Sequence, residues 1–77
     1  MIKILLFAHL QEEIGVKDFE IEVRETTVQQ LKELLKVKFK FPNLDNVMVA
    51  INEEYAMEQD VIHSGDTVAL IPPVSGG

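Results

Sequence analysis

The sequence predicts one small α+β domain in which a mixed β-sheet is crossed by one main helix. Three observations support this fold class: strand-like runs stand near both ends of the chain, one capped amphipathic helix lies between them, and 77 residues suffice for a single domain. The elements follow the order ββαββ. A hairpin, a crossover helix and a returning strand pack most economically as one sheet, with the last strand beside the first.

The first strand is the run from Ile2 to Ala8, which is short, apolar and carries one charge. These properties favour a central strand over a helix. Side chains alternate between the two faces of a strand, so the even positions would face the helix. The odd positions, Lys3, Leu5 and Phe7, would then lie on the opposite face of the sheet.

The second strand runs from Phe19 to Arg24, where apolar and charged residues alternate strictly. This pattern is typical of an antiparallel strand with one exposed face. The segment from His9 to Asp18, which contains Gly15, is interpreted as a polar connection. The two strands would therefore pair as a hairpin.

The main helix begins after a capping signal, because Thr26 with Gln29, or Thr27 with Gln30, fits a capping box. Pro42 would end it, since proline lacks the backbone N–H that a helix interior needs. Apolar residues at helical spacing form one stripe that is expected to cover the sheet. The stripe consists of Val28, Leu31, Leu35 and Phe39, with Leu34 on its flank.

The second half of the chain supplies the remaining strands. A third strand is expected from Val47 to Asn52, followed by a turn and a short extended piece at Tyr55 and Ala56. Gly65 and Asp66 provide turn chemistry before a last strand from Thr67 to Ile71. That strand leads directly into the end of the chain.

Composition limits the classes of function. Net charge is −6, from thirteen acidic and seven basic residues, which argues against partners that are nucleic acids or anionic membranes and favours a basic partner surface. The absence of cysteine excludes disulfides, thiolate metal sites and a cysteine nucleophile. No apolar run approaches the roughly 20 residues of a membrane span, and no signal peptide is recognisable. A cytoplasmic location is expected.

Side-chain catalysis has weak candidates. His9 and His63 lack neighbours at metal-ligand spacing, and surface histidines explain them better than a metal site does. The acidic pairs are explained as solvated charges, and no Ser/His/Asp arrangement stands out. No metal is expected.

The last six residues, Pro72-Pro73-Val74-Ser75-Gly76-Gly77, form the most informative stretch. The two prolines would end the last strand and extend the chain. Two glycines can thread a narrow channel, because neither carries a Cβ. We therefore divide the chain into a folded domain, 1–71, and an extended tail, 72–77, whose terminal carboxylate at Gly77 is the candidate reactive group.

The chain resembles the small, sulfur-carrier subunits of molybdopterin synthase. The resemblance covers essentially the whole length and is most specific in the ending Gly-Asp-Thr-Val-Ala-Leu-Ile-Pro-Pro-Val-Ser-Gly-Gly, residues 65–77. It implies the ubiquitin-like β-grasp fold. It also implies that Gly77 is adenylated with ATP by an E1-like activating enzyme and converted to a thiocarboxylate. The sulfur would then pass to a cyclic pyranopterin precursor.

The resemblance also implies partners and site residues. The carrier would act with a large synthase subunit in a heterotetramer, with no catalysis alone and no bound cofactor of its own. Gly77 would react, and Gly76 would give clearance in the channel. Partner-binding residues would be Phe7, Tyr55, Ile71, Pro72, Pro73, Val74 and Ser75.

Three other functions fit the sequence. The chain could carry sulfur for thiamine synthesis, although the long Pro-Pro-Val-Ser-Gly-Gly ending favours molybdopterin. It could be a ubiquitin-like modifier that is attached to lysines of other proteins. It could also be a β-grasp interaction module with an inert tail.

Overall fold

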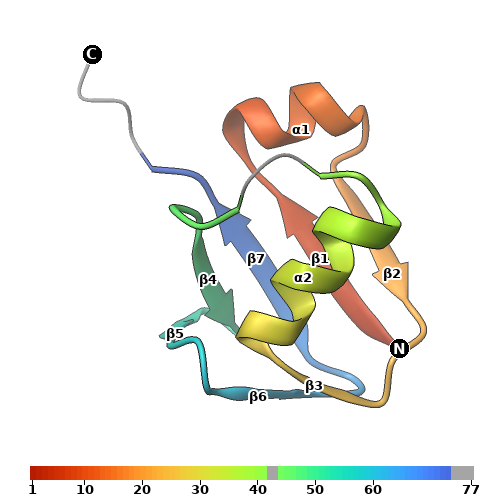
Figure 1. Ribbon diagram of the computed structural model, residues 1–77, viewed down its shortest axis with the longest axis vertical. Coiled ribbons are helices and arrows are strands. Elements are labelled where there is room, and N and C mark those ends of the chain that lie inside the picture. The colour runs from red at the N-terminus through yellow and green to blue at the C-terminus, as the bar shows by residue number, and fades with distance from the viewer. Residues whose placement is uncertain (42–43, 74–77) are drawn as a thin grey trace.

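The computed structural model describes residues 1–41 and 44–73, and these contain seven strands and two helices (Figure 1). In chain order the elements are β1 (Ile2–Leu6), α1 (Ala8–Ile14), β2 (Asp18–Ile21), β3 (Glu25–Thr27), α2 (Val28–Lys38), β4 (Met48–Ile51), β5 (Glu54–Ala56), β6 (Val61–His63) and β7 (Thr67–Ile71). Pro42 and the segment 74–77 lie outside the described residues.

The main sheet has five strands in the order β2-β1-β7-β4-β5. β1 pairs antiparallel with β2 and parallel with β7, and the pairs β7/β4 and β4/β5 are antiparallel. This arrangement confirms the expected mixed sheet, the opening hairpin and the position of the last strand beside the first. β3 and β6 form a separate two-stranded ribbon at the end of the molecule where α2 begins (Figure 1).

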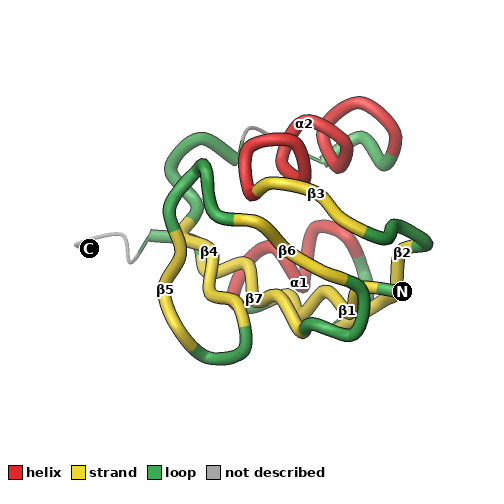
Figure 2. Tube along the Cα trace, turned by 90° about the horizontal axis from the view of Figure 1, so that it is seen from below, coloured by secondary structure: helices red, strands yellow, loops and turns green. Residues whose placement is uncertain are grey.

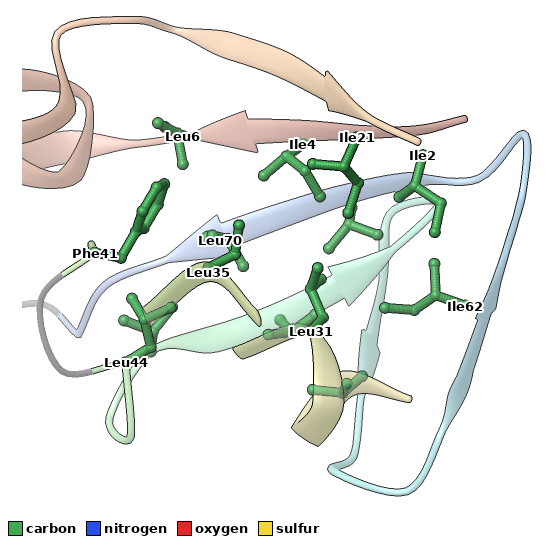
Figure 3. Close-up of a cluster of buried hydrophobic side chains, with 14 of the residues drawn as sticks. Ile2, Ile4, Leu6, Ile21, Leu31, Leu35, Phe41, Leu44, Ile62 and Leu70 are labelled. Atoms are coloured by element: carbon green, nitrogen blue, oxygen red, sulfur yellow. The ribbon is translucent and has the colours of Figure 1, made fainter. Parts of the chain in front are cut away.

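α2 crosses one face of the main sheet, and no described element covers the other face (Figure 2). The core lies between α2 and the sheet (Figure 3). Ile4, Val68 and Leu70 of the central strands have no exposed surface, and neither have Leu31 and Leu35 of α2. The expected alternation along the first strand is confirmed, because Ile2, Ile4 and Leu6 are buried while Lys3 and Phe7 are exposed.

The capping box at the start of α2 is the second of the two that the sequence allows. The Thr27 Oγ1 atom accepts a hydrogen bond of 3.1 Å from the Gln30 backbone N–H, and the Thr27 N–H donates to the Gln30 Oε1 atom at 3.2 Å. The N–H groups of Val28 and Gln29 donate at 3.0 Å to the carbonyls of Asp60 and Glu58. The helix start is therefore tied to the loop that precedes β6.

The interpretation of residues 9–18 as a polar connection is wrong, because α1 occupies most of this segment. Leu10 is 1% exposed, and Ile14, one turn later, packs against the core. Gly15 ends the helix in the left-handed region, with φ 91°, and its N–H donates to the Gln11 carbonyl at 2.9 Å. Ala8 begins this helix and does not extend β1.

Two further expectations need correction. Phe39 follows the end of α2 at Lys38 and is 43% exposed, so it does not belong to the buried stripe. Its ring lies 5.8 Å from that of Phe19 on β2. The predicted order ββαββ omits α1 and the three-residue strands β3, β5 and β6, although the sequence does predict an extended piece at Tyr55 and Ala56.

Candidate functional site

The uncovered face of the main sheet carries a continuous apolar row. Register places Leu5 of β1 beside Ala69 of β7, Ala69 beside Ala50 of β4, and Ala50 beside Tyr55 of β5. Paired residues on adjacent strands point to the same face of a sheet. The row therefore spans four strands and faces away from α2.

A second row lies one step closer to the end of β7. Ile71 is paired with Met48 of β4, and Phe7 directly follows the Leu6/Leu70 pair of β1 and β7. Met48 is 50% exposed and Phe7 is 45% exposed, although both are large apolar side chains. Because folding leaves these side chains in water, the surface is suited to contact with another macromolecule.

Apart from Met48, the two rows line a shallow groove of about 570 Å³ that contains Phe7, Tyr55 and Ile71, three of the residues expected from the sequence to bind a partner. The other lining residues are Leu5, Ala50, Asn52, Glu53, Thr67 and Ala69. We refer to the side chains of Leu5, Phe7, Met48, Ala50, Tyr55, Ala69 and Ile71 as the open face. The sequence analysis named Leu5 as a residue of this face and missed Met48, Ala50 and Ala69. Met48 and Ala69 alternate with buried neighbours, whereas Ala50 is itself buried.

Polar residues fix the end of this face that lies away from the tail. The Asn52 Oδ1 atom accepts a hydrogen bond of 3.0 Å from the Thr67 N–H, and the Asn52 Nδ2 group donates to the Asp66 Oδ1 atom at 3.0 Å. Asn52 and Glu53 both have positive φ, 50° and 72°, as the two central residues of the tight turn between β4 and β5. The turn is thereby attached to the start of β7.

The Asp66 carboxylate also accepts a hydrogen bond of 2.8 Å from the His63 N–H. This bond, together with the one from Asn52, lowers the pKa of Asp66 below its usual value, because both stabilise the ionised form. Asp66 therefore acts as a structural acceptor in the turn between β6 and β7.

The tail begins at the end of the open face that carries Phe7 and Ile71. β7 ends at Ile71, as expected from the two prolines that follow. Pro72 is buried and Pro73 is exposed. Pro72 therefore packs against the fold, whereas Pro73 does not. Val74, Ser75, Gly76 and Gly77 lie outside the described residues.

Within residues 1–41 and 44–73, no group of three or more metal-ligating side chains could hold an ion. His63 lies 3.7 Å from the Glu25 carboxylate, both are well exposed, and His9 lies on α1. None of the described helices is long and apolar enough to cross a membrane. The described residues thus offer a binding surface and the start of a tail.

A mixed five-stranded sheet wrapped around one helix defines the ubiquitin-like β-grasp class. The chain belongs to the ThiS family, whose sequence model matches residues 4–77. It is 40% identical over 82 residues to the molybdopterin synthase sulfur carrier subunit of Arabidopsis thaliana, and the alignment covers 99% of this chain and 82% of the relative. The family and fold that the sequence predicted are confirmed.

Two solved structures show the same architecture. A Pyrococcus furiosus chain with the provisional name molybdopterin converting factor, subunit 1, is 32% identical, with a TM-score of 0.76 and coverage of 95% of this chain and 97% of that one. Small archaeal modifier protein 1 of Haloferax volcanii is 29% identical, with a TM-score of 0.74 and coverage of 99% and 98%. The fold is thus shared by a chain named as a molybdopterin converting factor subunit and by one named as a protein modifier.

Proposed function

We propose that this protein is a sulfur carrier of molybdopterin synthase, in which Gly77 bears the sulfur as a thiocarboxylate. The observation that carries the proposal is the 40% identity, over 99% of the chain, to a subunit with that role in its name. The geometry supports it, because an exposed apolar face leads to the strand end from which the Gly-Gly tail departs.

The chemistry needs an activating partner, because a carboxylate is a poor acyl donor. The Gly77 carboxylate would attack the α-phosphate of ATP and release pyrophosphate, giving an acyl adenylate. A sulfide equivalent from a sulfur donor would then displace AMP and leave the thiocarboxylate. Since the sequence contains no phosphate-binding loop, an E1-like enzyme would hold the ATP.

The loaded tail would deliver its sulfur in the active site of a large synthase subunit. The terminal thiocarboxylate sulfur would attack a carbon of the cyclic pyranopterin precursor and displace the oxygen substituent bound there, giving a thioester. Water would then cleave the acyl–sulfur bond, which returns the Gly77 carboxylate and leaves a thiolate on the pterin. A dithiolene contains two sulfurs, so two loaded carriers would be consumed for each product molecule. In this scheme the carrier binds no cofactor and has no activity alone.

The open face would be the docking surface for the large subunit. Phe7 and Ile71 lie at its end closest to the tail, so docking there would aim the last residues into the partner. Pro72 is buried, which sets the direction in which the chain leaves the fold, and the exposed Pro73 would reduce the entropy that the tail loses on binding. Val74, Ser75 and Gly76 would lie within the channel of the partner.

The wider assignment follows from the same scheme. The carrier would form a heterotetramer with the large subunit and would work in the cytoplasm, where ATP is available. With a net charge of −6 it would bind neither nucleic acid nor an anionic membrane.

The likeness to small archaeal modifier protein 1 gives a second candidate function, attachment of Gly77 to lysines of other proteins. Both functions begin with adenylation, so activation alone does not separate them. They differ in the fate of the acyl group. A carrier passes sulfur to the pterin and recovers its carboxylate, whereas a modifier accumulates as isopeptide adducts.

The test is a product assay with purified activating enzyme, ATP, sulfur donor, large subunit and precursor. Three tails would be compared: the native end, a chain without Gly77, and a chain with one residue added after Gly77. We expect product from the native end alone, with large-subunit binding and circular dichroism unchanged in all three. Near-native product from the extended chain would contradict the proposal, and lysine adducts without product would favour the modifier.

A further inference from the structure

A second apolar surface lies at the opposite edge of the main sheet from β5. β2 is an edge strand, and within the described residues it pairs only with β1. On the helix side of β2 is a groove of about 340 Å³. It is lined by Ile14, Val16, Phe19, Glu20, Phe39 and Phe41, which we call the β2 groove.

The floor of this groove is formed by aromatic side chains that pack against one another. The Phe19 ring lies 5.8 Å from the Phe39 ring and 5.9 Å from the Phe41 ring. Phe41 is 5% exposed and belongs to the core, whereas Phe39 and Val16 are 43% and 44% exposed. Apolar surface therefore remains in water directly beside an edge of unpaired backbone groups.

The two sides of β2 differ in polarity. Asp18 and Glu20 are exposed and alternate with Phe19, so they lie on the face that carries Lys3 and Leu5. A strand added at this edge would thus meet the carboxylates of Asp18 and Glu20 on one face and the apolar β2 groove on the other.

We propose that the β2 edge binds an extended segment of another protein in which basic and apolar residues alternate. Backbone hydrogen bonds of the added strand would complete the edge, as in other cases of β-strand addition. The apolar residues would enter the β2 groove, and the basic residues would lie opposite Asp18 and Glu20, where opposite charges on neighbouring strands attract.

The same charges argue against other occupants. A second copy of this chain, paired antiparallel through β2, would bring Asp18 and Glu20 close to the same acidic residues. A uniformly basic segment would place charged side chains against the apolar residues of the β2 groove. The alternating segment is the occupant that satisfies both faces.

The added strand would lie in the plane of the sheet at the edge of β2, whereas the open face lies on one side of the sheet and meets β2 where Leu5 is paired with Asp18. The inference is independent of the sulfur-carrier proposal. If the β2 edge binds no such segment, the sulfur-carrier proposal is unaffected. Variants of Glu20 should therefore form molybdopterin as the native chain does.

The test is an NMR titration of the full chain with a short peptide that alternates lysine and valine. We expect saturable shifts at the amides of Asp18 and Glu20, whose N–H groups point to the free edge of β2, with smaller shifts in β5. The variant Glu20→Lys should weaken binding about fivefold or more. The matched control is Glu54→Lys on the other edge strand, which makes the same change in net charge and should bind as the native chain does.

A peptide in which glutamate and valine alternate should not bind the native chain. It should bind the double variant Asp18→Lys/Glu20→Lys. Shifts spread over the surface, or equal weakening by both single variants, would show nonspecific charge attraction and overturn the proposal. Absence of binding would show that the acidic residues of β2 only protect an exposed edge from pairing.

Discussion

The two faces of the main sheet differ although the same strands build them. In β7, Val68 and Leu70 have no exposed surface beneath α2, whereas Ala69 and Ile71 are half-buried on the open face. Each run of apolar residues thus serves two purposes at alternate positions. Residues on the helix side stabilise the fold, and residues on the open side remain available to a partner.

The largest effect on stability is expected from the helix side. Leu70→Ala removes a fully buried side chain and should lower the free energy of unfolding by about 3 kcal/mol, because a cavity adds to the lost transfer free energy. Leu5→Ala on the open face is the matched control and should cost less than about 1.5 kcal/mol. Chemical denaturation measures both, and equal losses would contradict the division between faces.

The open face should show the reverse pattern. Phe7 is the N-cap residue of α1 and makes no side-chain cap, and aspartate is a preferred N-cap residue, so Phe7→Asp should leave the fold intact. The same variant should weaken binding to the large subunit by about 2 kcal/mol, as expected for a buried apolar anchor. Calorimetry of the complex measures this loss. Ile71→Asp should behave alike, and unchanged binding by both variants would remove the open face from the interface.

A smaller effect is expected where the helix begins. Thr27→Ala removes one half of the capping box and should destabilise the fold by about 1 kcal/mol. Since the helix covers only the closed face, binding to the large subunit should not change at temperatures where the variant is folded. A thermal melt together with a binding titration tests this, and a loss of affinity without unfolding would show that the two faces are coupled.

The smallest effect concerns the turn that anchors the polar end of the open face. The pKa of Asp66 is lowered in the folded chain, so its contribution to stability is full above the ordinary carboxyl pKa of about 4 and is lost as pH falls through the lowered value. Asp66→Asn should therefore reduce the difference in stability between neutral and acidic pH. Denaturation at several pH values measures it, and an unchanged pH profile would exclude this contribution.

The sequence predicted the features that rest on long or strict patterns. The stripe at Val28, Leu31 and Leu35 and the apolar runs of β1 and β7 were predicted correctly. The alternation from Phe19 to Arg24 predicted the second strand, although β2 ends at Ile21. Their packing order followed from the need to cover one sheet with one helix. The first strand also indicated which side chains the helix would leave uncovered.

Short elements were not predictable in the same way. α1 has seven residues and only one fully buried side chain, so its polar composition resembles a loop, although Leu10, Ile14 and the cap at Gly15 together were a usable signal. β3 and β6 have three residues each, too few for a periodic pattern, and exist because they pair with each other.

The candidate site was predicted in part. Phe7, Tyr55 and Ile71 were expected together and share one groove, whereas Met48 was missed because its exposure depends on the pairing of β4 with β7. The β2 groove was not predicted at all. Its aromatic floor joins Phe19, Phe39 and Phe41, which come from both halves of the chain and meet only in the folded structure.

The most direct test of the account is the intact mass of the protein after incubation with the activating enzyme, ATP and a sulfur donor. We expect one sulfur-for-oxygen increment, located by fragmentation on the peptide that contains Gly77. The increment should disappear when the large subunit and the pyranopterin precursor are added. An unchanged mass in the presence of an enzyme that loads a known carrier, or an increment on any other peptide, would contradict the assignment of Gly77 as the residue that carries sulfur.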